Sequence, residues 1–203
     1  DEVGTYNGSI DGAAWVKDSD AGVTGLAALP DARQWCLSFD GTNDKVTNAN
    51  GWVGTGSETP IAYPDNPGRL AAYTIKAWVK VTPANLAGMV GGGAIIAFTN
   101  SGDGDVYVGL GILSDGQLAF RHSDGDVTPS TVDDDHDIEL FSTTTYANSA
   151  WHQIAGVKES NSLFTLYVDG VLKNTSTHTI NATTTLTSFG FGAHVENPDV
   201  YFA

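Results

Sequence analysis

Apolar and polar residues alternate over strand-length stretches along this chain, most clearly between residues 151 and 177. Residues 151–158 and 163–168 each have the length and the β-branched and aromatic content of a strand, and the polar residues 159–162 between them have the composition of a turn. Asp169-Gly170 then supplies a glycine where a tight hairpin needs a positive φ angle. The pattern therefore predicts three adjacent antiparallel strands.

The same alternation predicts further strands upstream. In residues 72–81, four small or branched apolar residues alternate with two lysines and a tryptophan: Ile75, Ala77, Val79 and Val81 against Lys76, Trp78 and Lys80. Additional strands are predicted at 94–100, 105–113 and 116–122. Residues 4–16 are predicted to form a strand, a turn and a second strand, and residues 36–46 a strand that ends in a glycine-containing turn. No helix, repeat or linker pattern interrupts them, so we expect one all-β domain over residues 1–203.

Composition and charge narrow the possible partners. The 203 residues are enough for one β-sandwich with a full core. The net charge of −15 provides no broad basic surface to neutralise nucleic-acid phosphates or anionic lipid. Cys36 is the only cysteine, so no internal disulfide can form, and no apolar run reaches the roughly 20 residues of a membrane-spanning helix. The sequence thus predicts neither a nucleic-acid partner nor membrane insertion.

Four stretches resemble, in the same order, the laminin-G-like jelly rolls of the concanavalin A-like lectin/glucanase superfamily. Asn7–Trp15 has the glycines and the tryptophan of the family pattern G-N-x-G-x-I-x-G-A-x-W, and Leu37–Val46 contains F-D-G-x-x-D-x-V. The third stretch is the strand predicted at 72–81. The fourth is Trp151–Leu172, which contains W-H-x-I-A and L-Y-V-D-G-x-L. The resemblance implies a jelly-roll sandwich of two antiparallel sheets. It also implies a non-catalytic binding or adhesion module, with a carbohydrate or glycoprotein ligand, outside the cell or on the surface of a cell, virion or appendage.

The end of the chain departs from the family pattern. Relatives follow a Y-F-x-G run with a last strand, whereas this sequence stops at Tyr201-Phe202-Ala203. One interpretation is that the sequence is a piece of a longer protein. The other is an open apolar edge beside residues 185–192, to which a neighbouring copy or an adjoining protein adds a strand. The second interpretation gives an alternative function, a structural subunit of a virion, appendage or filament.

Two acidic stretches are candidates for calcium, which takes six to eight oxygen ligands from carboxylates, amides and loop carbonyls. In the resembling sandwiches, loops at these two places meet on calcium at one rim. The candidate ligands are Asp103 and Asp105 in the expected loop 101–105, and Glu196, Asn197 and Asp199 in 194–199. Residues 132–139 are a second cation candidate, although a solvated acidic loop is the favoured interpretation of them.

Aromatic side chains are candidates for sugar contact, because their faces stack on apolar surfaces. Trp52, Tyr63 and Trp78 are the expected ligand-binding residues, with Lys76 and Lys80 on the strand face of Trp78. The tryptophans in apolar strand patterns, Trp15, Trp35 and Trp151, are expected in the core.

Asp135, Asp137 and Glu139 have the E-x-D-x-E spacing by which glucanases of this superfamily place two working carboxyls on one strand. Retaining chemistry needs those carboxyls about 5–5.5 Å apart. An aspartate at position 135 is one methylene shorter than glutamate, and the surrounding sequence lacks the run of aromatic residues expected in a sugar cleft. We therefore expect no enzyme activity, with a glycoside hydrolase as the alternative.

Overall fold

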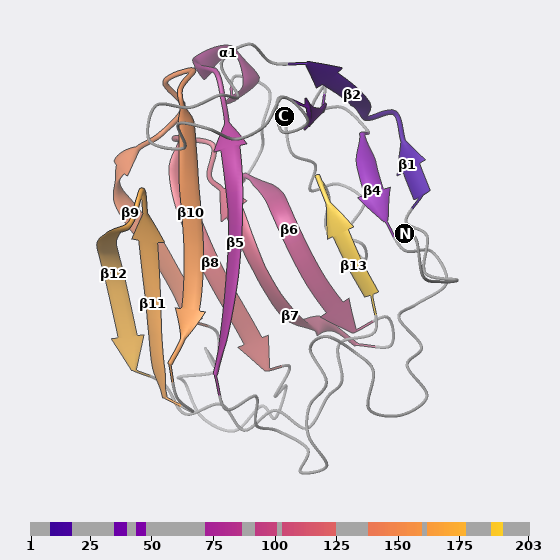
Figure 1. The fold of residues 1–203 in the computed structure, drawn as a ribbon. Helices are drawn as coiled ribbons and strands as arrows, with labels where there is room; N and C mark the ends of the chain where they lie inside the picture. Colours follow the sequence, from indigo (N-terminus) through magenta and orange to yellow (C-terminus); the bar gives the residue numbers. More distant parts are fainter. Residues whose placement is uncertain are drawn as a thin grey trace.

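The computed structural model describes residues 9–17, 35–39, 44–47, 72–86, 92–100, 103–124, 138–159, 162–177 and 188–192. These residues form an all-β jelly-roll sandwich (Figure 1). The strands are β1 (Ser9–Asp11), β2 (Ala14–Lys17), β3 (Trp35–Ser38), β4 (Lys45–Thr47), β5 (Tyr73–Lys80), β6 (Gly93–Asn100), β7 (Asp103–Ile112), β8 (Gln117–Asp124), β9 (Ile138–Thr145), β10 (Trp151–Lys158), β11 (Leu163–Val168), β12 (Val171–Thr177) and β13 (Ser188–Phe191). A single helical turn, α1 (Pro83–Leu86), follows β5.

Two antiparallel sheets form the layers of the sandwich. One has seven strands in the order β1-β4-β13-β6-β7-β8-β9, and the other has four in the order β12-β11-β10-β5. In Figure 1 the four-stranded sheet lies in front of β6, β7 and β8. Strands β2 and β3 form a separate two-stranded sheet.

The predicted strands at the C-terminal half are confirmed almost residue for residue. Strands β10 and β11 begin and end where the alternation placed them, and β12 continues antiparallel after the turn. At that turn Asp169 has φ 52° and Gly170 φ 73°, the left-handed geometry that an Asp-Gly hairpin adopts. The hairpin is therefore explained by local turn chemistry together with the period-two pattern.

An open sheet edge was predicted beside residues 185–192, of which the structure describes 188–192. For these described residues the prediction is wrong. Strand β13 pairs with β6 along its full length and with β4 at Gly190 and Phe191, so it lies inside the seven-stranded sheet. Among the described strands, two eight-residue strands lie at a sheet edge: β5, which pairs with β10, and β9, which pairs with β8.

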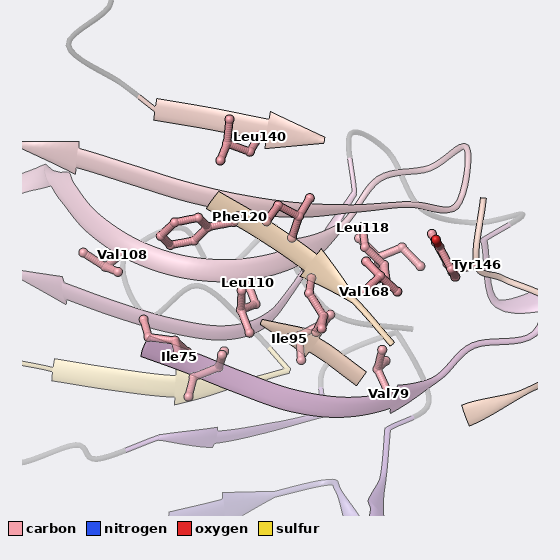
Figure 2. Close-up of a cluster of buried hydrophobic side chains, with 14 of the residues drawn as sticks. Ile75, Val79, Ile95, Val108, Leu110, Leu118, Phe120, Leu140, Tyr146 and Val168 are labelled. Atoms are coloured by element: carbon pink, nitrogen blue, oxygen red, sulfur yellow. The ribbon is translucent and has the colours of Figure 1, made fainter. Parts of the chain in front are cut away.

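The core lies between the sheets, where large apolar side chains from both layers interdigitate (Figure 2). Phe120 on β8 is fully buried and points toward the four-stranded sheet. It fills the space over Gly156 of β10, which has no side chain of its own there. A ring from one sheet thus packs directly on the backbone of the other, which brings the two layers close at this point.

One end of the core is closed by polar side chains. Lys158 is 1% exposed, and its Nζ lies 6.0 Å from the ring centroid of Phe164. The Tyr73 hydroxyl hydrogen-bonds Nδ1 of His122, whose ring stacks on that of Tyr73. Because buried polar groups need partners, these contacts restrict how β5, β8 and β10 align.

The prediction that Trp15 lies in the core is also wrong. Trp15 is 60% exposed, because β2 belongs to the small two-stranded sheet and not to the two layers that enclose the core. Trp151 is only half-buried and faces away from the core, on the outer side of β10.

Candidate ligand-binding face

The outer face of the four-stranded sheet is formed by every second residue of its strands. On β5, Ile75 and Val79 are buried while Lys76 and Trp78 are exposed, so the predicted alternation of this strand is confirmed. On β10 and β11 the inward residues Ile154 and Leu166 are fully buried. The residues that alternate with the inward ones on each strand therefore share the outer face with Trp78.

The strand register sets these outward residues in cross-strand rows. Trp78 lies opposite Gln153, and Lys80 lies opposite Trp151. Lys76 lies opposite Ala155, which in turn lies opposite Tyr167 of β11. Residues directly opposite one another have Cβ atoms about 4.5–5.5 Å apart, so each row is one continuous contact surface.

Trp78 is the most prominent aromatic side chain of the face, with 40% of its surface exposed. Ala155 lies diagonally across from it and is short, so the surface is lower there than at Lys76 and Tyr167 on either side. The indole therefore stands beside a shallow step, with an amide group, Gln153, as its direct neighbour. An exposed ring next to hydrogen-bonding groups can stack on an apolar surface and orient it at the same time.

The face extends over β11 to β12. Tyr167 lies opposite Leu172, whose side chain is 54% exposed and continues the outer face. Val171 is 56% exposed, but it lies opposite the inward Val168 and does not belong to this face. Trp78 and Leu172 are two of the six large apolar side chains that are exposed in the described parts of the chain. The outer face therefore carries exposed apolar surface on β5 and on β12.

Trp151 also lies on the outer face, which its sequence pattern did not predict. Its indole Nε1 is buried and has no hydrogen-bond acceptor among the described residues. A buried donor without an acceptor is destabilising by about 1–3 kcal/mol. The apolar pattern around Trp151 suggested a core position, and only the register opposite Lys80 places it on the outer face.

A hydrogen-bond network holds one end of the face. Asp169 accepts a hydrogen bond from the backbone N–H of Gln153 through Oδ1 (2.9 Å), and its Oδ2 lies 2.7 Å from Nδ1 of His152. On the other side of the imidazole, Nε2 lies 3.0 Å from Oδ1 of Asn148, which also accepts the N–H of Ala150 at 3.0 Å. The network fixes the start of β10, including the position of Gln153 opposite Trp78.

The other predicted ligand residues, Trp52 and Tyr63, lie outside the described residues, as do the calcium candidates Glu196, Asn197 and Asp199. Asp103 and Asp105 were expected in a loop, but the backbone of β7 begins at Asp103, so both belong to a strand. Within the described ranges, no group of three or more histidine, cysteine, aspartate or glutamate side chains is close enough to hold a metal ion. The calcium site stays a prediction.

Glu139 lies on β9 of the opposite sheet, away from this face. Its Oε1 is 2.9 Å from Nε of Arg121, the residue directly across on β8. A carboxylate in such an ion pair is held in one orientation. Asp135 and Asp137 lie outside the described residues. Of the three carboxylates with the glucanase-like spacing, the structure therefore describes Glu139 alone.

The family model described as the concanavalin A-like lectin/glucanases superfamily matches residues 55–203, which is more than half of the chain. The chain belongs to this superfamily. The match begins after the two N-terminal stretches that resembled it, so the shared pattern is carried by the strands from β5 onward. No curated protein sequence matches the chain.

Several solved structures are similar to this chain. The binding domain of Paraclostridial Mosquitocidal Protein 1 matches with a TM-score of 0.56 and 12% identity, over 96% of this chain and 42% of that one. The receptor binding domain of botulinum neurotoxin D matches with a TM-score of 0.52 and 16% identity, over 77% and 35%. Domains LG4-5 of the mouse laminin alpha1 chain match with a TM-score of 0.45 and 16% identity, over 61% and 29%.

In each case this chain spans less than half of the matched structure. At 12% and 16% identity, the likeness to the two toxin domains shows the fold alone, and the ligand must be inferred from the residues of this chain.

Proposed function

We propose that this domain is a non-catalytic module that binds carbohydrate on the outer face of the four-stranded sheet. The observation that carries the proposal is the exposed indole of Trp78, which stands on a regular strand beside Gln153 and between two lysines. Pyranose rings have apolar CH faces that stack on indole, and their hydroxyl groups pair with amides. A side chain on a rigid strand also loses little conformational freedom on binding.

The shape of the face suits an extended ligand. The rows from Lys76 to Tyr167 and from Trp78 to Gln153 lie side by side on a sheet, with exposed apolar residues continuing toward Leu172. Several sugar units of an oligosaccharide or a glycoprotein chain can therefore contact it at once. Catalysis is not part of this proposal, because the described outward residues of the face include no carboxylate pair.

Replacing Trp78 with alanine is expected to weaken oligosaccharide binding at least tenfold, or about 1.4 kcal/mol, because the stacking surface is removed. The ligand is first selected on a glycan array, and its affinity is then measured by isothermal titration calorimetry. Trp15→Ala is the matched control, since Trp15 is even more exposed but lies on the separate two-stranded sheet. Equal losses in both variants, or no loss at Trp78, would contradict the assignment of this face.

We further propose that calcium supports the fold and that the module works outside the cell or on a particle surface. Asp103, Asp105, Glu196, Asn197 and Asp199 are the candidate ligands. A ligand that binds only the folded state stabilises it by about 2.7 kcal/mol at one hundred times its Kd. The melting temperature is therefore expected to rise in millimolar calcium and to fall with chelator, and superimposable melting curves would remove the ion from the proposal.

A second candidate function, a structural subunit, is favoured by the position of β5. This eight-residue strand is an edge strand among the described strands, and such an edge can accept a strand from a neighbouring copy or an adjoining protein. Light scattering coupled to size-exclusion chromatography separates the two candidates. A monomer at micromolar concentration that binds glycan would exclude self-assembly through β5.

A further inference from the structure

Two lysines lie on the face around Trp78, although the whole protein carries a net charge of −15. Lys76 and Lys80 flank the indole, and the described outward residues of β5, β10, β11 and β12 include no carboxylate. The nearest described acids are at the ends of the sheet. Glu159 follows β10, four residues beyond Ala155 and thus about 13 Å along the strand, which exceeds the roughly 8 Å screening length of physiological salt. Asp169 already accepts hydrogen bonds in the hairpin turn.

Lys76 differs from three other described cations. Lys45 lies 3.9 Å from Asp11, and Arg121 lies 2.9 Å from Glu139, so each has a carboxylate beside it. Lys173 has its Nζ over the ring of Tyr146. Lys76 is exposed, and no carboxylate of the described residues lies within ion-pair distance of it. Its ammonium group is therefore positioned to meet an anion that comes from outside.

The spacing along β5 relates this cation to the indole. Lys76 and Trp78 point to the same side two residues apart, about 7 Å along the strand. A lysine side chain is long enough to carry its ammonium over that distance, and it can rotate to meet a charged group on a sugar ring stacked on the indole. Ala155, directly opposite Lys76, leaves room for the substituent.

From this geometry we infer that the ligand is an acidic glycan, in which Lys76 binds a carboxylate or a sulfate group while the sugar ring stacks on Trp78. The inference rests on the proposed function and adds the chemical class of the ligand. The attraction acts at short range, because the net negative charge of the protein repels anions at longer distances.

The test compares three probes with the same core: lactose, lactose capped with sialic acid, and lactose carrying a sulfate ester. Affinities are measured by calorimetry for the unmodified protein, Lys76→Gln and Lys45→Gln. Both variants change the net charge equally, but Lys45 lies on β4 of the other sheet. An exposed ion pair contributes little, so we expect one or both acidic probes to bind roughly threefold to fivefold tighter than lactose. Lys76→Gln should remove most of that difference, and Lys45→Gln should retain it.

The outcomes separate the two levels of the proposal. A preference for only one acidic probe identifies the group that Lys76 binds. Equal affinity for all three probes, with binding still dependent on Trp78, overturns the acidic ligand and leaves the carbohydrate-binding face standing. Equal effects of Lys76→Gln and Lys45→Gln overturn the local role of Lys76. Failure of Trp78→Ala to affect any bound glycan overturns the face itself.

Discussion

Gly156→Ala is expected to destabilise the sandwich by roughly 2–3 kcal/mol, because the new methyl group would overlap a buried ring. A Cβ atom at this position would lie 2.4 Å from Cδ2 and 2.5 Å from Cγ of Phe120. Phe120 is fully buried against Tyr73 and Phe164, with ring centroids 6.4 Å apart in both pairs, so it cannot swing aside. Equilibrium unfolding in urea measures the loss.

A double-mutant cycle isolates the cause. Phe120→Ala alone is expected to destabilise by about 3–5 kcal/mol through the cavity it leaves. In that background Gly156→Ala should be nearly neutral, since the overlapping ring is gone, which gives a coupling energy of about 2 kcal/mol. Gly170→Ala is the matched control, because a Cβ there meets nothing within 4 Å and only the positive φ is unfavourable. Additive effects of the Gly156 and Phe120 substitutions would show that the sheets do not pack as described.

Asp169→Ala is expected to destabilise the fold by about 2 kcal/mol. The substitution removes two hydrogen-bonding oxygens, those facing Gln153 N and His152 Nδ1, and places alanine at a φ of 52°, which aspartate tolerates better. The effect is limited because the Asp169 side chain is 44% exposed. Asp169→Asn keeps one acceptor and the tolerance of positive φ, so it should lose about half as much. Thermal unfolding of both variants tests this order, and an alanine variant as stable as the asparagine variant would contradict it.

The strands could be predicted from sequence where local chemistry decides them. The alternation in β5, the turn at Asp169-Gly170 and the lengths of β10 and β11 all follow from period and turn residues within a few positions. The grouping of Trp78 with Lys76 on one strand face was predictable for the same reason.

The rest of the face depends on which strands become neighbours. Alternation shows that a strand has two sides, but it does not show which side another sheet covers. Trp15 and Trp151 therefore looked like core residues, although the first lies on a separate small sheet and the second faces outward. The packing of Phe120 on Gly156 joins two sheets and leaves no local signal at either residue. The interior position of β13 likewise depends on its pairing with β4 and β6, which are far away in the chain.

The pairing of β5 with β10 has a consequence for the order of folding. Strands β10, β11 and β12 are joined by short turns and can form a local meander, whereas the register of β5 with β10 joins residues such as Lys80 and Trp151 across the whole of β6 to β9. Closing so long a loop loses more chain entropy than closing a hairpin, so this pairing should form late. Trp78 and Gln153 come from the two sides of that late pairing. Ligand binding should therefore appear only in the last phase of refolding, and it would serve as a kinetic reporter that the two halves of the sheet have joined.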